Sequence, residues 1–269
     1  VDGFNVNLSG TNNYKDTKNS DVIIITAGVP RKPGMTRDDL LGTNLKIIKQ
    51  VAEGIKKTSP NAFVICITNP LDVIVMALQK YSKLPETKVV GMAGILDTSR
   101  FKYFLSQELK IPIKKINSLV LGGHGDTMVP TLNHTIIDGK SLSQLVKDNK
   151  ISAEKLKFII DRTRKGGAEI VKLLEKGSAF YAPAASGIEM AESYIKDLKK
   201  TLPCAAYLNG EYNVKGLYAG VPVVVGKNGV EKVLELELND QEKNSFKISV
   251  QSVEELFKSA QKIDPDLSK

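Results

Sequence analysis

The fold is decided by the stretch Val22-Ile23-Ile24-Ile25-Thr26-Ala27-Gly28. A continuous apolar run of this length, rich in β-branched residues and closed by a glycine, predicts a parallel strand that is buried on both faces. The following residues, 29–34, include two prolines and another glycine, which predicts a loop. We therefore expect this strand to belong to a unit in which strands alternate with helices.

The alternation continues as far as residue 93. The apolar spacing predicts a helix at about 38–58, a buried strand at 62–68, a helix at 72–81 and a third strand at 88–92. Strands and helices in this order form a parallel sheet with right-handed crossovers. The expected fold class is α/β, with a Rossmann-type parallel sheet in a partial dinucleotide-binding domain over residues 1–93.

The pattern changes at residue 94. The segments predicted beyond it are helices at 98–109, 153–176, 188–199 and 240–262, and strands at 116–121, 204–208, 221–225 and 230–236. Helices and short strands mixed in this way predict an α+β domain over residues 94–269, which we expect to carry the substrate-binding and catalytic residues. Two domains agree with a chain of 269 residues, since domains average roughly 100–200 residues.

The composition excludes several classes of protein. The chain is 42% hydrophobic and 25% charged, as in ordinary globular proteins. No apolar run reaches the roughly 18–20 residues of a membrane helix, so we expect no membrane partner. The net charge of +8 is scattered, without a basic block and without tryptophan, so we expect no nucleic-acid partner. Cys66 and Cys204 lack metal-ligand spacing, which predicts reduced thiols, no metal site and a cytoplasmic protein.

Polar residues follow the predicted parallel strands at the edge where α/β proteins bind ligands. Asn69 offers both a donor and an acceptor to a ligand, although an asparagine before Pro70 is equally typical of a turn. Arg31 and Arg37 lie in the first loop, where guanidinium groups are able to grip a carboxylate through two hydrogen bonds. Loop arginines are also commonly solvated, so both interpretations stay open.

One histidine has a setting suited to catalysis. His124 lies in Gly122-Gly123-His124-Gly125-Asp126, where three glycines allow a ligand to approach closely. A carboxylate bound to one ring nitrogen would raise the pKa of the imidazole and leave the other nitrogen to exchange a proton. Asp97 is a candidate for that carboxylate, but its position alone favours a role as the cap of the helix predicted at 98–109, with Arg100 as its ion-pair partner. His134 lacks such a setting and is expected to be structural or exposed.

Four segments, 24–37, 67–72, 94–100 and 122–126, together resemble the lactate/malate dehydrogenase family, and within it the bacterial lactate-dehydrogenase-like malate dehydrogenases. The resemblance covers essentially the whole chain. It implies reversible NAD-dependent oxidation of (S)-malate to oxaloacetate, with hydride passing to the nicotinamide. It also implies a small dicarboxylate substrate and a homodimer or homotetramer.

The resemblance assigns roles in proton exchange and substrate binding. His124 would exchange a proton with the substrate hydroxyl, and Asp97 would orient the imidazole and stabilise its charged form. Arg100 would bind the carboxylate remote from the reacting carbon. Arg37, on a closing loop, would polarise the substrate carbonyl.

The resemblance also assigns cofactor contacts and the choice of substrate. Asn69 would contact both substrate and nicotinamide, and the cofactor site would be lined by Asn44, Ile67 and Thr68. Arg31 would compensate the second carboxylate of malate, where lactate dehydrogenases have a neutral glutamine, because an uncompensated charge in a closed site is costly. Dehydrogenases of lactate or another 2-hydroxy acid remain an alternative, as does a non-catalytic basic binding remnant of the fold.

The chain lacks the G-x-G-x-x-G turn with which the family's dinucleotide-binding domain begins. We therefore expect an N-terminally incomplete domain, without its first strands and with roughly fifty residues preceding Val1, about the size of a βαβ unit. The 269-residue chain alone should bind NAD poorly, because a helix N-terminus that holds the pyrophosphate is lacking. It should also expose one edge of its sheet.

Overall fold

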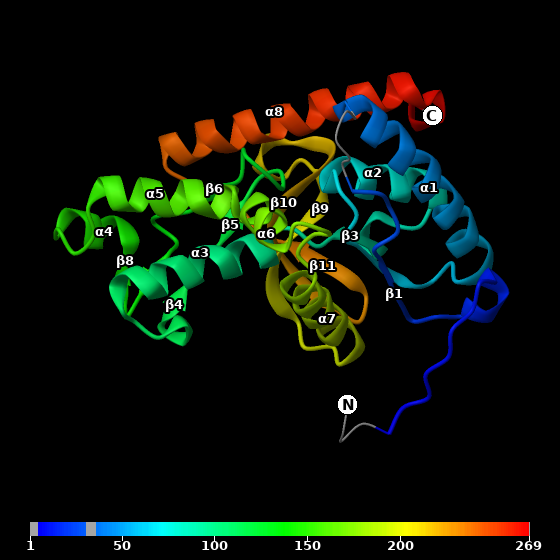
Figure 1. The fold of residues 1–269 in the computed structure, drawn as a ribbon, viewed down its shortest axis with the longest axis horizontal. Coiled ribbons are helices and arrows are strands. Elements are labelled where there is room, and N and C mark those ends of the chain that lie inside the picture. The colour runs from blue at the N-terminus through cyan, green and yellow to red at the C-terminus, as the bar shows by residue number, and fades with distance from the viewer. Residues whose placement is uncertain (1–4, 31–35, 269) are drawn as a thin grey trace.

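The computed structural model describes residues 5–30 and 36–268, and a six-stranded sheet lies at its centre (Figure 1). The strands follow the order β1-β2-β3-β9-β10-β11 across this sheet. Their bounds are β1 (Val22–Ile25), β2 (Phe63–Cys66), β3 (Val89–Gly91), β9 (Lys200–Asn209), β10 (Lys215–Gly226) and β11 (Gly229–Val233).

The sheet is mixed rather than wholly parallel. β1, β2 and β3 are parallel, as the alternation with helices predicts. β9 then pairs antiparallel with β3 through Gly91 and Ala205, and β10 and β11 continue antiparallel. β9 and β10 are longer than their sequence pattern suggests and β11 is shorter, and all three extend the sheet that the N-terminal strands begin.

Helices cover both faces of this sheet. On one face α1, α2 and the end of α8 bury Leu45, Ile74 and Phe257 against the strands. On the other face α7 and the start of α3 bury Met190 and Leu96. The bounds of these helices are α1 (Arg37–Thr58), α2 (Leu71–Ser82), α3 (Gly94–Leu109), α7 (Tyr181–Ile195) and α8 (Asp240–Ile263).

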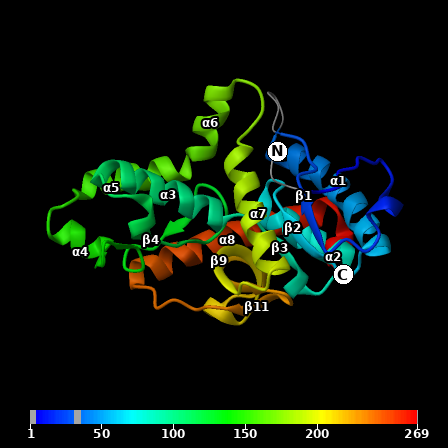
Figure 2. The ribbon, with the colours of Figure 1, turned by 90° about the horizontal axis from the view of Figure 1, so that it is seen from below.

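A second group of elements extends from the sheet on the side away from α1 and α2, as Figures 1 and 2 both show. Phe101, Leu105 and Ile159 lie at the centre of its separate core. This group contains α3 with α4 (Leu142–Lys147), α5 (Ala153–Arg164), β4 (Ile116–Asn117), β5 (Val120–Leu121), β6 (Val129–Pro130), β7 (Ile136–Ile137) and β8 (Lys140–Ser141). A further helix, α6 (Gly166–Leu174), follows α5.

Short 3-10 helices complete the elements of the described residues. Their bounds are η1 (Tyr14–Thr17), η2 (Glu86–Lys88), η3 (Ile113–Lys115), η4 (Glu211–Asn213) and η5 (Pro265–Ser268).

Local sequence accounts for the first helix. Thr36 Oγ1 accepts the Asp39 N–H at 3.1 Å and Asp39 Oδ2 accepts the Thr36 N–H at 3.0 Å, which forms a capping box at the start of α1. α1 buries an apolar stripe against the sheet. The residues of this stripe recur at helical spacing: Leu41, Leu45, Ile48, Ala52 and Ile55.

β1 is a correction to the sequence analysis. It is an edge strand that pairs with β2 alone within the described residues, and Ile24 is 41% exposed. The expectation of burial on both faces was therefore wrong for β1, whereas it holds for all four residues of β2. The apolar run identifies the strand, but its neighbours in the sheet decide the burial.

Two features bear on the class of protein. Of the helices in the described part of the chain, none is both long enough and apolar enough to cross a membrane. Cys66 and Cys204 are both free and buried, and burial raises the pKa of the Cys66 thiol to about 12. These thiols are therefore unreactive at neutral pH.

Candidate active site

His124 lies in the loop that follows β5. Gly122, at the start of this loop, has a φ of +84° and pairs with Gly220 of β10 through two main-chain hydrogen bonds. A positive φ favours glycine. This main-chain pairing fixes the loop to the central sheet and directs His124 toward the first turn of α3, where its ring meets Asp97.

Asp97 and His124 form a buried pair. Asp97 Oδ2 lies 2.8 Å from His124 Nδ1, and the two side chains are 2% and 16% exposed. Burial alone would lower the pKa of His124, but the Asp97 charge and hydrogen bond, with the Asp72 charge, outweigh it and raise that pKa above its ordinary value. Within the described residues Nε2 of this ring has no hydrogen-bond partner, so it is available to a ligand.

The structure decides between the two interpretations of Asp97. α3 begins at Gly94, four residues earlier than its sequence pattern suggests, and its N-cap is Ala93 without a side-chain cap. Asp97 is therefore not the cap of this helix. Its carboxylate is directed to His124, and its other oxygen lies 3.5 Å from Arg100 Nη1.

Arg100 completes a cluster of three ionisable side chains with Asp97 and His124. Its side chain is 13% exposed, and burial lowers its pKa somewhat. A Cβ added to Gly166 would lie 3.0 Å from Arg100 Cδ, so the glycine at the start of α6 leaves room for the arginine. The longer contact to Asp97 leaves most of the guanidinium N–H donors for an anionic ligand.

Two side chains that the sequence analysis missed hold the His124 loop. Asp72 Oδ2, on the first turn of α2, accepts the His124 N–H at 2.8 Å. Ser249 Oγ, on α8, accepts the neighbouring Gly123 N–H at 2.8 Å. The available signal for Asp72 was an acidic residue in a helix that is otherwise almost wholly apolar from Leu71 to Leu78. Ser249 gives no comparable signal.

Asn44 joins two loops at the edge of the sheet. It is buried, accepts the Val29 N–H at 2.8 Å and donates to the Asn69 carbonyl oxygen at 2.8 Å. Its amide is therefore occupied by the two loops that follow β1 and β2. Asn69 itself is exposed, and its side chain has no hydrogen-bond partner in the described parts of the chain.

At the same edge, the loops that follow β1 and β2 pack closely against each other. Thr68 is buried and donates to the Ala27 carbonyl oxygen at 2.7 Å, while Ile67 is half-buried. A Cβ on Gly28 would lie 2.6 Å from Thr68 Cγ2, so the loops after β1 and β2 are in contact here. Exposed Asn69 beside half-buried Ile67 provides a polar and an apolar surface, which fits the amide and ring of a nicotinamide.

Two predicted site residues cannot be placed. Arg31 lies outside the described residues. Arg37 is the first residue of α1, but its side chain also lies outside what the structure describes.

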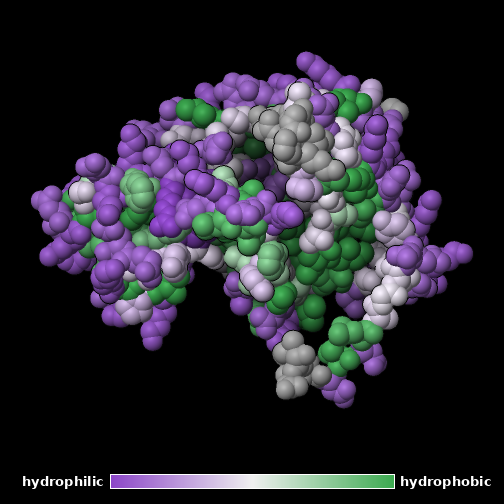
Figure 3. Space-filling view, in the orientation of Figure 1, coloured by the Kyte–Doolittle hydropathy of each residue, from purple (hydrophilic) through white to green (hydrophobic). Residues whose placement is uncertain are grey.

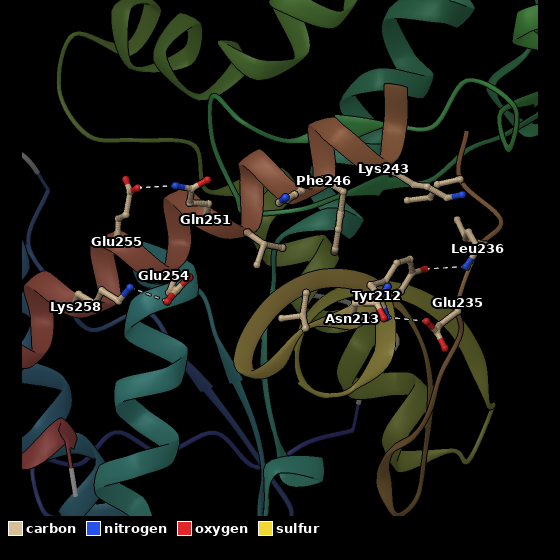
Figure 4. Close-up of a pocket in the computed structure, with 14 residues that line it drawn as sticks. Tyr212, Asn213, Glu235, Leu236, Lys243, Phe246, Gln251, Glu254, Glu255 and Lys258 are labelled. Carbon is tan, nitrogen blue, oxygen red and sulfur yellow. Dashed lines mark hydrogen bonds and ion pairs between the residues drawn. The ribbon is translucent and has the colours of Figure 1, made fainter. Parts of the chain in front are cut away.

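A cavity of about 730 Å³ lies elsewhere, between α8, η4 and the segment that follows β11 (Figure 4). Two of the contacts on its rim are internal: Lys258 Nζ lies 2.7 Å from Glu254 Oε1, and Gln251 donates to Glu255 at 3.2 Å. It contains none of the predicted site residues. In the residues that the structure describes, no group of three or more His, Cys, Asp or Glu side chains is arranged to hold a metal ion.

The sheet and the cluster together define the class of protein. A carboxylate, an imidazole and a guanidinium meet beside the sheet, and among the described residues one imidazole nitrogen and several guanidinium N–H groups have no partner. These three groups together are typical of an α/β enzyme that exchanges a proton with an anionic substrate.

Comparisons with known proteins identify the family. The lactate/malate dehydrogenase NAD-binding domain matches residues 2–91, and the α/β C-terminal domain of the same family matches residues 95–263. The chain belongs to the lactate/malate dehydrogenase family. A malate dehydrogenase of Pelagibacter ubique is 69% identical over 269 residues, covering 100% of this chain and 84% of that protein.

Solved structures agree with this assignment. A malate dehydrogenase of Cryptosporidium parvum is 51% identical with a TM-score of 0.90, over 94% of this chain and 81% of that one. A lactate dehydrogenase of the same organism, solved with lactic acid and nicotinamide adenine dinucleotide, is 46% identical with a TM-score of 0.90, over 94% and 80%.

Proposed function

We propose that this chain catalyses the reversible NAD-dependent oxidation of (S)-malate to oxaloacetate. The observation that carries the proposal is the buried contact of 2.8 Å between Asp97 Oδ2 and His124 Nδ1, which leaves His124 Nε2 available to a substrate hydroxyl. The malate dehydrogenase that is 69% identical over the whole chain supports the choice of reaction.

His124 acts as the general base in malate oxidation. Asp97 accepts a hydrogen bond from Nδ1–H, so the neutral ring presents an unprotonated Nε2 to the hydroxyl. When Nε2 has taken the proton, the Asp97 carboxylate stabilises the imidazolium. In the reverse direction the same nitrogen returns the proton to the carbonyl oxygen of oxaloacetate.

Arginines bind the dicarboxylate. Arg100 binds the carboxylate remote from the reacting carbon, and the room that Gly166 leaves allows its guanidinium to lie flat against that group. Arg37 polarises the carbonyl and Arg31 compensates the second carboxylate. These two roles rest on the sequence resemblance.

The residues at the edge of the sheet hold the nicotinamide. When bound, this ring supplies hydride exchange with the carbon that bears the hydroxyl. Ile67, Thr68 and Asn69 line its site, with Asn69 also reaching the substrate. Asn44 contributes by holding the loops after β1 and β2 together. We retain a division of the chain at residues 93 and 94 between the cofactor-binding and substrate-binding parts.

Lactate is the second candidate substrate. The solved lactate dehydrogenase has the same TM-score of 0.90 as the malate dehydrogenase from that organism, so backbone similarity does not separate the two activities. Arg31 favours malate, since it offers a positive charge to a second carboxylate.

The test compares NADH oxidation with oxaloacetate and with pyruvate in the full-length protein. Wild-type kcat/KM should be at least 100-fold higher for oxaloacetate, and Arg31→Gln should move this ratio toward pyruvate by about 10-fold or more, as expected for a charge left without its partner. His124→Asn should abolish both activities. A wild-type preference for pyruvate would refute the proposed substrate.

We also propose a cytoplasmic homo-oligomer, either a dimer or a tetramer. Exposed apolar side chains gather over α7 and β1, where Figure 3 shows a continuous green surface. Among them Ile188 and Ile195, seven residues apart on α7, are 60% and 64% exposed. An apolar surface of this kind is typical of a contact between subunits. The reduced, buried thiols agree with a cytoplasmic location.

A further inference from the structure

Asp72 connects two parts of the proposed active site. It is the second residue of α2, the helix that begins two residues after Asn69, and it is only 6% exposed. Its Oδ2 accepts the main-chain N–H of His124 at 2.8 Å, although the two residues are 52 positions apart in the sequence. One short segment thus presents Asn69 at the edge of the sheet and holds the His124 loop with Asp72.

The charge of Asp72 is not needed for this hydrogen bond. The adjacent N–H, of Gly123, is satisfied by the neutral hydroxyl of Ser249 at the same distance of 2.8 Å. Asp72 also carries a second oxygen, Oδ1, that is buried without a hydrogen-bond partner in the described residues. A buried carboxylate with an unsatisfied oxygen destabilises a protein. A neutral side chain would therefore hold the loop at a smaller cost.

The pKa of Asp72 reflects this burial. Desolvation raises the pKa of Asp72 to about 6, and the neighbouring Asp97 charge adds to the shift, while the His124 charge and N–H oppose it. The carboxyl group is consequently ionised at pH 7 and above, so a second negative charge lies beside His124 under the conditions in which malate would be oxidised.

The charges around His124 balance only when its ring is protonated. α2 contributes the Asp72 carboxylate, and α3 contributes the Asp97 carboxylate and the Arg100 guanidinium. The side chain that α8 contributes, Ser249, is neutral. Among the described side chains that interact with His124, the two carboxylates outnumber the one guanidinium when the imidazole is neutral, and the charges cancel when it is protonated. Asp97 acts at the ring, whereas Asp72 acts from the main-chain side.

We propose that Asp72 is a positioning residue for the reaction, which holds the main chain of His124 through its Oδ2 and, as a second carboxylate beside Asp97, stabilises the imidazolium formed by proton transfer. The proposal rests on the proposed function, in which His124 exchanges the proton with the substrate. It assigns to Asp72 an electrostatic role in addition to the structural one that any hydrogen-bond acceptor would fill.

The test measures the titration of His124 directly. The chain contains two histidines, so an NMR titration of ¹³Cε1-labelled imidazoles gives two signals, and His134→Gln assigns them. His134 is an internal control, because its Nε2 contacts the Glu237 carbonyl oxygen at 2.9 Å and neither Asp72 nor Asp97. Asp72→Asn keeps an oxygen for the His124 N–H but removes the charge.

In Asp72→Asn the titration midpoint of His124 should fall by about one pH unit, as expected for the loss of a nearby opposite charge, and that of His134 should stay unchanged. The upper pH limit of oxaloacetate reduction should fall with the His124 midpoint, and the KM for NADH should stay within about 2-fold, because the midpoint is the property that the charge controls. A His124 midpoint equal to that of the wild type would overturn the proposal, since a merely structural role predicts that result.

The wild-type protein gives a second readout that needs no variant. Because coupled groups sense each other's ionisation, the His124 signal should show an additional inflection near pH 6 from Asp72. A single inflection would contradict the role of Asp72. A different result would refute the proposed function itself. If His124→Asn retained malate oxidation, His124 would not exchange the proton, and the proposal for Asp72 would be refuted as well.

Discussion

Asp97 and His124 are 27 positions apart in the sequence, yet Asp97 Oδ2 and His124 Nδ1 are only 2.8 Å apart. The contact forms because the first turn of α3 and the loop after β5 lie side by side, and the Val120 N–H donates to Thr98 Oγ1 at 3.0 Å between them. The position of the imidazole is therefore determined by how α3 packs against β5.

Asp97→Asn should lower kcat for malate oxidation by about 10²–10⁴-fold, because the ring loses the group that fixes its tautomer and stabilises its charge. The pKa of His124 is raised in the wild type mainly by Asp97, against the effect of burial. Oxaloacetate reduction needs the protonated ring, so in the variant it should decline at a lower pH than in the wild type. Initial rates from pH 5 to 10 measure both effects.

Asp138→Asn is a matched control for this prediction. Asp138 is exposed and pairs with Lys115 at 3.0 Å on the surface, so its loss should leave the rate and its pH dependence unchanged. An Asp97→Asn enzyme with the wild-type pH dependence would contradict the assigned role.

Gly166→Ala should weaken substrate binding through Arg100. The added methyl group would lie 3.0 Å from Arg100 Cδ, so the arginine side chain would have to move by a few tenths of an ångström. We expect the KM for oxaloacetate to rise about 5- to 50-fold, equivalent to roughly 1–2 kcal/mol. Steady-state kinetics check this, and binding of NADH measured by fluorescence should change little.

Gly167→Ala is the control for that substitution. A Cβ on Gly167 meets no atom within 4 Å, although it occupies the next position in the same helix. Both alanines should stabilise the start of α6 similarly, because alanine has the higher helix propensity. Equal KM values for the two variants would show that the space beside Arg100 is not needed.

Asp72→Asn should stabilise the folded protein at neutral pH while it impairs the reaction. The folded-state pKa of Asp72 is raised from 3.8 to about 6 by burial. The Asp72 carboxyl should therefore lower the stability of the wild type as the pH rises from about 4 to about 6, and this loss should persist above that range. The variant should gain on the order of 3 kcal/mol at pH 8 and nothing below pH 4.

Thermal unfolding at pH 4 and pH 8 measures this difference. A variant that is less stable than the wild type at pH 8 would mean that the buried carboxylate contributes more through its hydrogen bond than its desolvation costs.

Ser249→Ala should disturb the His124 loop without touching the cluster of charges. Ser249 Oγ accepts the Gly123 N–H and donates to Thr127 Oγ1 at 3.0 Å, and the residue is fully buried. A donor left unsatisfied costs about 1–3 kcal/mol of stability, and kcat should fall more than KM rises. Ser252→Ala on the same helix is the control, because that hydroxyl donates only to the Ile248 carbonyl oxygen within α8.

Ile188→Asp should shift the protein toward smaller assemblies, since the change places a charge on the apolar surface over α7. Light scattering on the intact protein measures the mass. Ile113→Asp provides the comparison, because Ile113 is 43% exposed but lies in η3, far from that surface in sequence. Assemblies of equal mass in both variants would argue against α7 as a subunit contact.

The sequence predicted elements whose signals are local. The apolar stripe and the acidic first turn of α1 identify the helix at 38–58, and the structure has it at Arg37–Thr58. The start of α3 was misplaced, because no capping side chain precedes Gly94. The burial expected for Ile24 from its apolar run was wrong, since an apolar run does not reveal the position of its strand within the sheet.

The sequence predicted part of the candidate site and missed the rest. His124 was identifiable from its glycines, and the resemblance paired it with Asp97. Asp72 was missed because its contact with His124 exists only after the chain has brought α2 and the loop after β5 together, and an acidic residue in the first turn of a helix has an ordinary explanation in the helix dipole.

The pairing of Gly122 with Gly220 determines the orientation of His124 before a ligand binds. Gly122 and Gly220 exchange two main-chain hydrogen bonds, and a Cβ on Gly220 would collide with the carbonyl oxygen of Gly122. These contacts fix the loop that carries the imidazole to the central sheet in the absence of a ligand. The orientation of the imidazole is therefore fixed before the substrate binds, and the entropic cost of aligning the reacting groups falls mainly on the substrate.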